Sequence, residues 1–182
     1  KSEQKIGDKI LILGAGTIGL LVLQVAKLAG AGEVIITDIR DYRLKKAKEF
    51  GADEVLNPIN EDIFSYIKNN YGSDRIDLIY DCVVIEETCS QSIRIARKGT
   101  KIIIVGVSEG SINVNLTYVQ DRELELIGTL MYTKKDFYTA LEFIRRQKIQ
   151  VSPLVTHKFK LREIEKAFQF LMKKKGEFFK IL

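Results

Sequence analysis

The chain has 182 residues, of which 46% are hydrophobic and 29% are charged, and this is the composition of an ordinary globular domain. Its formal net charge of +5 is spread along the chain, which argues against nucleic acid as a partner. The apolar runs are far shorter than the roughly 20 residues of a membrane span, and two cysteines are too few for a disulfide framework. These features predict one cytoplasmic domain without a membrane or nucleic-acid partner.

Hydrophobic periodicity predicts that strands and helices alternate from the start of the chain. A short β-rich run over 9–13 ends in glycine, and residues 19–31 then carry apolar side chains at helical spacing. Further strands are expected over 34–37, 54–56, 76–81 and 101–106, and further helices over 43–50, 61–70 and 86–97. This order is typical of an α/β fold in which about six parallel strands form a doubly wound sheet with helices on both faces.

The pattern changes after residue 110. Strands over 112–116 and 123–129, joined by a turn over 119–122, are expected to extend one edge of the sheet. Helices over 134–146 and 161–174 each carry one apolar stripe, and the first is expected to cover the sheet. Strands over 155–159 and 178–182 flank the second helix. We expect residues 1–182 to form a single domain.

A glycine-rich turn, Gly14-Ala15-Gly16-Thr17-Ile18-Gly19, stands between the first strand and the first helix. Gly14 allows a tight turn, Gly16 lets the backbone approach a pyrophosphate, and Gly19 lets the helix pack closely on the strand. Backbone N–H groups and the helix dipole favour an anion at this helix N-terminus. The turn therefore predicts a Rossmann fold that binds a dinucleotide, the alternative being a plain tight connection.

Asp38 follows the second strand, about 20 residues after Gly19, where dinucleotide-binding domains carry an acidic residue. A carboxylate there can accept both hydroxyls of the NAD ribose and would repel the 2′-phosphate of NADP. Arg40 and Arg43 keep NADP open, because either could pair with that phosphate. The alternative role of Asp38 is to cap the following helix. NAD is the predicted cofactor.

Several segments, in chain order, resemble the medium-chain dehydrogenases, and more narrowly their zinc-dependent branch of sorbitol, threonine and butanediol dehydrogenases. The matching segments are 7–19, Thr37-Asp38, 48–53, Asp81-Cys82-Val83, 99–107, 126–128, 151–157 and 165–168. The family's cofactor domain is the second of two, and its first domain holds the catalytic zinc. The resemblance implies that this chain is the NAD-binding domain alone. Because it begins without an initiator methionine, we expect a fragment of a longer protein.

The resemblance also implies which residues contact the cofactor. Ile18 should touch it, Asp38 should hold the adenosine ribose, and Arg43 should lie on the adenine side. The full expected set is Gly14, Gly16, Thr17, Ile18, Gly19, Asp38, Ile39, Arg43, Cys82, Val83, Val105, Gly106, Val107, Thr129, Leu130 and Met131. Residues 105–107 should lie beside the nicotinamide, and residues 129–131 should close its pocket. Core packing is the alternative for the apolar members.

Some residues depart from the family or fall outside its chemistry. Family members usually carry glycine where this sequence has Val84, and a β-branched residue tolerates positive φ poorly, so cofactor affinity could be lowered. Cys82 and Cys89 have no partner cluster for zinc. They are expected near the cofactor cleft and facing the core, respectively. His157 is expected on a strand at a surface. No catalytic residue and no metal ligand is expected in this chain.

The resemblance implies that the intact protein oxidises a secondary alcohol of a polyol or amino alcohol by moving hydride to NAD, with zinc polarising the alkoxide. The chain alone should bind cofactor without turnover. We expect a homo-oligomer, a dimer or tetramer, in which edge strands over 112–116 and 123–129 pair between subunits, as in the family. The alternatives are a zinc-free reductase of the same superfamily, a stand-alone NAD-sensing module, and a domain that binds S-adenosylmethionine.

Overall fold

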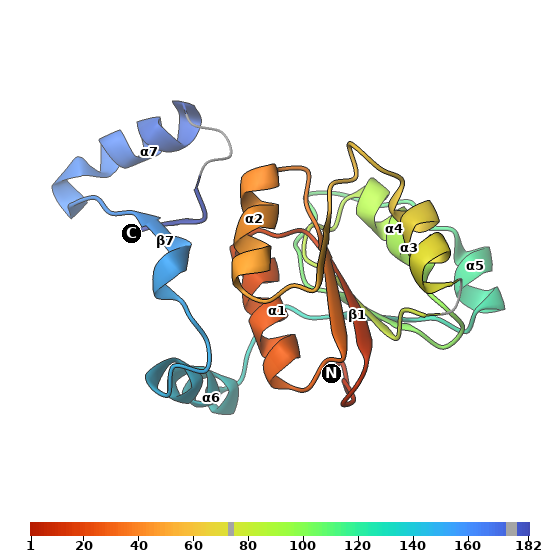
Figure 1. The fold of residues 1–182 in the computed structure, drawn as a ribbon. Coiled ribbons are helices and arrows are strands. Elements are labelled where there is room, and N and C mark those ends of the chain that lie inside the picture. The colour runs from red at the N-terminus through yellow and green to blue at the C-terminus, as the bar shows by residue number, and fades with distance from the viewer. Residues whose placement is uncertain (73–74, 174–177) are drawn as a thin grey trace. The chain divides into compact units, whose positions relative to one another are not determined.

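The computed structural model describes residues 1–72, 75–173 and 178–182. These residues form two compact units, Lys1–Thr133 and Lys134–Leu182 (Figure 1). Each unit has its own sheet. The expectation of a single domain over 1–182 remains a prediction.

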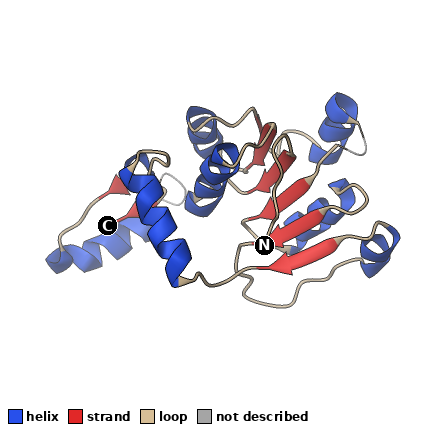
Figure 2. Ribbon diagram, turned by 90° about the horizontal axis from the view of Figure 1, so that it is seen from below, coloured by secondary structure: helices blue, strands red, loops and turns tan. Residues whose placement is uncertain are grey.

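The first unit is built on a six-stranded parallel sheet. Its strand order is β3-β2-β1-β4-β5-β6, and every neighbouring pair is parallel (Figure 2). The strands are β1 (Lys9–Leu13), β2 (Glu33–Thr37), β3 (Glu54–Leu56), β4 (Leu78–Asp81), β5 (Lys101–Ile104) and β6 (Glu125–Gly128). The strand order reverses between β1 and β4, and at such a switch point an α/β sheet binds its ligand.

Helices cover both faces of this sheet. They are α1 (Thr17–Leu28), α2 (Asp41–Glu49), α3 (Ile63–Tyr71), α4 (Glu86–Ile95) and the short α5 (Leu116–Asp121). Figure 1 shows α1 and α2 on one face, with α3 and α4 on the other. The predicted doubly wound Rossmann fold is therefore confirmed, with element boundaries that shift by a few residues.

The core explains why the central strands carry runs of consecutive apolar residues. Residues 10–13 of β1 and 34–36 of β2 are fully buried, because a parallel sheet covered on both faces has no solvent side. On the α3 and α4 side, Leu11, Ile79 and Ile102 pack with Ile63 and Ile93 in one cluster. Because all six strands are parallel, their carboxyl ends lie along one edge of this core.

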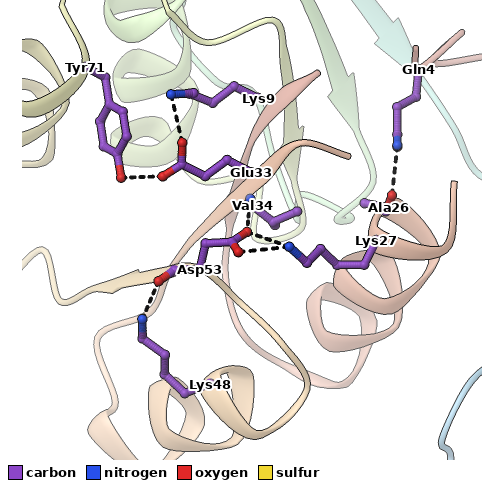
Figure 3. Close-up of polar contacts among 9 residues, drawn as sticks. All are labelled: Gln4, Lys9, Ala26, Lys27, Glu33, Val34, Lys48, Asp53 and Tyr71. Atoms are coloured by element: carbon purple, nitrogen blue, oxygen red, sulfur yellow. Dashed lines mark hydrogen bonds and ion pairs between the residues drawn. The ribbon is translucent and has the colours of Figure 1, made fainter. Parts of the chain in front are cut away.

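Polar contacts tie the outer elements to the opposite, amino edge of the sheet (Figure 3). Lys9 of β1 forms an ion pair of 2.8 Å with Glu33 of β2, and the Tyr71 hydroxyl donates to the same carboxylate at 2.7 Å. Asp53, just before β3, accepts from Lys27 of α1 at 2.7 Å and from the Val34 N–H at 2.6 Å. These contacts tie α1 and α3 to β1 and β2 at this edge of the sheet.

The predicted strand over 112–116 is wrong. Residues 111–115 have no regular structure, and α5 begins at Leu116. The Asn115 side chain accepts from the Thr117 N–H at 3.0 Å and so caps this helix. The alternation of apolar residues and asparagine resembled a strand, but Val114 and Leu116 are exposed, so it buries no face. The predicted turn over 119–122 lies mostly within α5.

The predicted strand over 123–129 is confirmed as β6, which is shorter and pairs in parallel with β5 through contacts such as Ile103 to Ile127. β6 is an outer strand of the sheet.

Gly51, at φ +91°, follows α2 and ends it in the left-handed conformation that an L-residue with a side chain rarely adopts.

The second unit contains two helices and a small sheet. Its elements are α6 (Lys134–Arg145), η1 (Ser152–Leu154), β7 (Val155–His157), η2 (Leu161–Glu163), α7 (Ile164–Lys173) and β8 (Lys180–Ile181). β7 and β8 pair in parallel. The predicted end of the last helix at residue 174 lies outside the described residues. That α6 covers the six-stranded sheet stays a prediction.

An aromatic cluster joins β7 to α7 within this unit. The His157 ring lies 4.3 Å from the Phe170 ring, centroid to centroid, and Phe159 and Phe178 also contact Phe170. His157 is half-buried, and its Nδ1 has no hydrogen-bond partner among the described residues. The histidine thus packs on its strand as part of a small core.

Of the helices described in either unit, none is long and apolar enough to cross a membrane.

Candidate functional site

The glycine-rich turn lies at the carboxyl end of β1. Gly14 has φ +95°, and a Cβ there would lie 2.5 Å from Val83 Cγ2. A Cβ on Gly19 would lie 1.8 Å from the Gly14 carbonyl oxygen. A Cβ on Gly16, in contrast, would meet Arg43 Nη1 at 3.8 Å as its nearest neighbour. Two glycines are therefore required by the fold itself, and Gly16 leaves an approachable backbone surface where α1 begins.

Asp38 is buried at the end of β2 and closes this turn. Its Oδ2 accepts from the Ala15 N–H at 2.9 Å and from Arg43 Nη1 at 3.2 Å. Its Oδ1 accepts from the Arg40 N–H at 3.0 Å. The helix α2 begins at Asp41 with Arg40 as its N-cap residue, so the alternative that Asp38 caps this helix is wrong. The carboxylate instead joins the second strand to the glycine turn.

Arg43 lies beside this carboxylate on α2. Its Nε donates to the Tyr42 hydroxyl at 3.0 Å, in addition to the contact with Asp38. Burial alone would lower the pKa of Arg43, but these hydrogen bonds and the negative charge of Asp38 raise it on balance. Arg43 is thus a fixed positive charge next to Asp38 and above Gly16.

A cavity of about 280 Å³ opens next to Asp38 and Arg43. Ile39, Pro58, Val83 and Ile85 give it apolar walls, and Thr88 and Gln91 of α4 complete it. Apolar side chains thus share the lining with polar and charged ones, a combination that can hold both the faces and the polar edge of a ring. The structure brings the predicted residues Gly14, Asp38, Ile39, Arg43 and Val83 together here.

Asp81, fully buried at the end of β4, organises the two neighbouring turns. Its Oδ1 accepts from the N–H groups of Val83 and Val84 at 3.0 and 2.8 Å. Its backbone carbonyl accepts from the N–H groups of Val105 and Gly106 at 2.8 and 3.0 Å. The side chain thus shapes the turn after β4, and the carbonyl ties that turn to the end of β5.

Val84 stands where the resembled family usually carries glycine, and its backbone is in the left-handed conformation, with φ +62°. For a β-branched residue this backbone is an outlier that costs on the order of 1–3 kcal/mol. The side chain is buried, and its Cγ2 lies 2.9 Å from where Gly106 would carry a Cβ. Val84 therefore fills the space between the turns after β4 and β5.

The two cysteines are embedded thiols. Cys89 is buried and its Sγ donates to Asp81 Oδ2 at 3.5 Å, and Cys82 is half-buried. Burial raises the pKa of Cys82 to about 12 and that of Cys89 to about 11. Both remain protonated at neutral pH, whereas thiolate is the form that binds metals. The prediction that Cys89 faces the core is confirmed.

The remaining predicted residues follow β5 and β6 at the same edge of the sheet. Val107, Leu130 and Met131 are 73%, 78% and 80% exposed, so the core-packing alternative is wrong for these three. Ile18, at the start of α1, is also exposed. Thr129 is held, because its hydroxyl donates to the Ile104 carbonyl at 3.1 Å. This side of the edge therefore forms an open apolar surface.

Further cavities lie elsewhere on the first unit. One of about 460 Å³ is at the amino edge of the sheet, between Lys9, Asp77 and Arg97. Parallel α/β sheets bind their ligands at the carboxyl edge, and Arg97 is already paired with Asp77 at 2.8 Å. Another, of about 440 Å³, adjoins Val84 and Val107 at the carboxyl edge. The candidate site is therefore the carboxyl edge.

The sequence analysis missed Pro58, Ile85, Thr88 and Gln91 as cavity residues. The spacing of Thr88 and Gln91, three residues apart directly after β4, could have indicated a shared helix face toward the site. In the part of the chain that the structure describes, no three His, Cys, Asp or Glu side chains gather as metal ligands.

Strand order, switch point and glycine turn together define a Rossmann-type domain. The family model "Zinc-binding dehydrogenase" matches residues 17–146. The chain belongs to this zinc-binding dehydrogenase family, and the predicted resemblance is confirmed.

Known dehydrogenases match this chain along nearly its whole length. It is 29% identical to sorbitol dehydrogenase 1 of Saccharomyces cerevisiae, over 98% of this chain and 52% of that protein. An Escherichia coli structure described as a short chain alcohol dehydrogenase, complexed with NADH, gives a TM-score of 0.90 at 25% identity and covers 99% of this chain and 53% of its own. A zinc-binding dehydrogenase structure from Sinorhizobium meliloti, bound to NADP, gives 0.88 at 26% identity, with coverage of 99% and 53%. The chain spans about half the length of the curated relatives it matches.

Proposed function

We propose that this chain is the NAD-binding part of a dehydrogenase that oxidises a secondary alcohol of a polyol or a related amino alcohol. The observation that carries the proposal is the buried Asp38 carboxylate, which joins the glycine turn to an apolar cavity at the sheet's switch point. The similarity to a sorbitol dehydrogenase supports the substrate class.

The residues present fit a dinucleotide. The open backbone at Gly16 and the start of α1 would hold the pyrophosphate, and Asp38 has acceptor oxygens for the ribose hydroxyls. The cavity beside Ile39 and Val83 would take the adenine. Thr17 and Cys82 belong to the proposed contact set as neighbours of the turn and of the β4 end. When bound, the cofactor accepts the hydride that the alcohol loses.

On the other side of the turn, the chain would orient the reactive ring. Residues Val105, Gly106 and Val107 follow β5, and we propose that Val107 backbone groups bond the carboxamide of the nicotinamide. Thr129, Leu130 and Met131 would cover the ring and exclude water, with Thr129 held in place by its bond to the Ile104 carbonyl. These residues bind and orient, and they move no proton.

The cofactor preference rests on charge. A carboxylate at Asp38 repels a 2′-phosphate, which favours NAD. Arg43 lies 3.2 Å from this carboxylate and could pair with the phosphate of NADP if it turned away. The similar structure from Sinorhizobium meliloti is bound to NADP, so NADP stays the alternative cofactor. NAD is the proposed cofactor.

The catalytic zinc of the intact enzyme belongs, in this proposal, to a part of the protein outside this chain. The described residues offer it no ligand set, so no reaction step through zinc is derived from them. We propose that residues 1–182 form one cofactor domain that binds NAD without turning over substrate by itself.

The proposed assembly is a cytoplasmic homo-oligomer, a dimer or tetramer. β6 is the outer strand that a second copy could extend. Residues 112–116 cannot contribute such a strand in the conformation described. A stand-alone NAD-sensing module and a zinc-free reductase remain the rival functions, since both would use the same glycine turn.

Calorimetric titration of the purified protein with NAD, NADP and S-adenosylmethionine tests the proposal. NAD should bind most tightly, and Asp38→Ala should weaken it by about tenfold or more, because bonds to a charged acceptor contribute about 1.5–3 kcal/mol. Asp121→Ala, at an exposed position on α5, is the matched control and should leave binding unchanged. Preference for either other ligand, or an Asp38→Ala variant that binds NAD normally, contradicts the assignment.

A further inference from the structure

Helix α4 presents two polar side chains to the 280 Å³ cavity. Thr88 and Gln91 are three residues apart and both line it, because residues at this spacing share one helix face. The buried residues Cys89 and Ile93 lie on the side of the helix opposite Gln91. The inward direction of Gln91 is therefore set by the packing of the helix.

The polar side chains of the cavity differ in how many hydrogen bonds they already form within the protein. Asp38 accepts from two backbone N–H groups and from Arg43. The Thr88 hydroxyl accepts from the Ile85 N–H at 3.1 Å and donates to the Ile85 carbonyl at 3.2 Å. The Gln91 side chain is half-buried, and its amide bonds to no other residue that the structure describes. Gln91 keeps both its donor and its acceptor for a ligand.

A glutamine amide pairs well with one edge of adenine. Its oxygen accepts from the 6-amino group while its nitrogen donates to N7, and this two-bond contact is the common way in which glutamine reads adenine. The apolar walls formed by Ile39, Val83 and Ile85 suit the faces of the same ring. Edge and faces would thus be recognised from different elements.

We propose that Gln91 is a specificity-determining residue that selects adenine as the base of the dinucleotide, through the 6-amino group and N7. This inference rests on the proposed function, because it requires that a dinucleotide occupies the cavity. In hypoxanthine an oxygen replaces the 6-amino group, so the same edge offers two acceptors and the amide can pair with only one. The site therefore discriminates between the two bases.

The test compares the binding of NAD with that of nicotinamide hypoxanthine dinucleotide by calorimetry. The unchanged protein should bind NAD about tenfold more tightly, within the range measured for one such two-bond contact. Gln91→Leu should bring the ratio of the two affinities close to one, chiefly by weakening NAD. Gln120→Leu, at an exposed position on α5, should keep the ratio of the unchanged protein.

The outcomes separate this inference from the proposed function. If NAD does not bind, or binds without regard to Asp38, the proposed function itself fails. If NAD binds through Asp38 and Gln91→Leu retains the base preference, or if the unchanged protein has none, the role of Gln91 is overturned. Gln91→Met, which also lacks the amide, replaces the leucine variant if thermal unfolding shows that the latter does not fold.

Discussion

The two sides of the proposed cofactor site differ in how complete they are within this chain. On the side of β2 and β4, the buried Asp38 and Asp81 hold the turns, and the chain closes a cavity of about 280 Å³. On the side of β5 and β6, Val107, Leu130 and Met131 stand exposed. The first side is thus fixed by buried hydrogen bonds, whereas the second presents exposed apolar side chains beside the cavity of about 440 Å³.

This difference teaches which part of the chemistry each side can carry. A site made rigid by buried hydrogen bonds can select a ligand, because its groups are positioned before the ligand arrives. An open apolar wall gains specificity only when another surface covers it. We therefore expect affinity to depend mainly on the side of Asp38, and turnover to depend on parts of the protein beyond this chain.

The largest expected effect breaks the pocket at its glycine turn. In Gly19→Ala, the added Cβ would collide with the Gly14 carbonyl oxygen at 1.8 Å, so the turn must shift and the chain should lose several kcal/mol of stability and its NAD binding. Denaturant unfolding and titration measure both. Gly110→Ala, where the Cβ would meet open space, is the control. Equal behaviour of the two variants contradicts the geometry described.

A smaller effect concerns the strain at Val84. Val84→Gly releases about 1–3 kcal/mol of backbone strain but loses about 1.5–3 kcal/mol of buried side chain, so its stability should change little. Val84→Ala loses the burial and keeps the positive φ, and should be the less stable variant. Chemical denaturation ranks the two.

The control for this ranking is Val55, which lies in β3 with an ordinary strand backbone. At that position Gly should be worse than Ala, because glycine costs about 0.5–1 kcal/mol in a strand. If the order at Val84 is the same as the order at Val55, the positive φ at Val84 carries no strain and the account of this turn is wrong.

The smallest effect is expected on the open side. Leu130→Ser and Met131→Ser change exposed side chains, so the stability of the chain should move by no more than about 0.5 kcal/mol. Turnover by the intact protein should fall, because the proposed nicotinamide cover is lost. Thermal unfolding and steady-state kinetics check the two halves of this prediction. A large loss of stability would mean that these residues belong to the core after all.

The sequence placed the glycine turn and Asp38 at the ends of the first two strands, where local rules apply, and the structure has them there. Asp38 follows the glycine turn at the spacing typical of dinucleotide-binding domains. The strand-turn-helix setting of the glycines leaves the backbone little conformational freedom. The resembled family usually carries glycine at the position of Val84, and the positive φ observed there agrees with that pattern. Local backbone chemistry and apolar runs were sufficient for the glycine turn and Asp38, whereas the expectation at Val84 came from the family resemblance.

Other features depended on contacts that no local pattern records. Residues 112–116 alternate like a strand, yet the Asn115 cap on α5 and the absence of a face to bury decide against it. Asp81 forms bonds to residues 83, 84, 105 and 106, and half of these lie on another strand's end. Gln91 could be recognised only once its helix was placed against the cavity.

By itself, the sequence determined the α/β class, the order of elements through β5, the glycine-rich turn and the place of Asp38 after β2, because these follow from hydrophobic period and glycine conformation. The tertiary structure alone decided which side chains share the cavity, which groups donate hydrogen bonds to Asp38 and Asp81, and which residues after β5 and β6 stay exposed. The physical reason is that burial and hydrogen bonding between strand ends depend on distances in space, which separation along the chain does not encode.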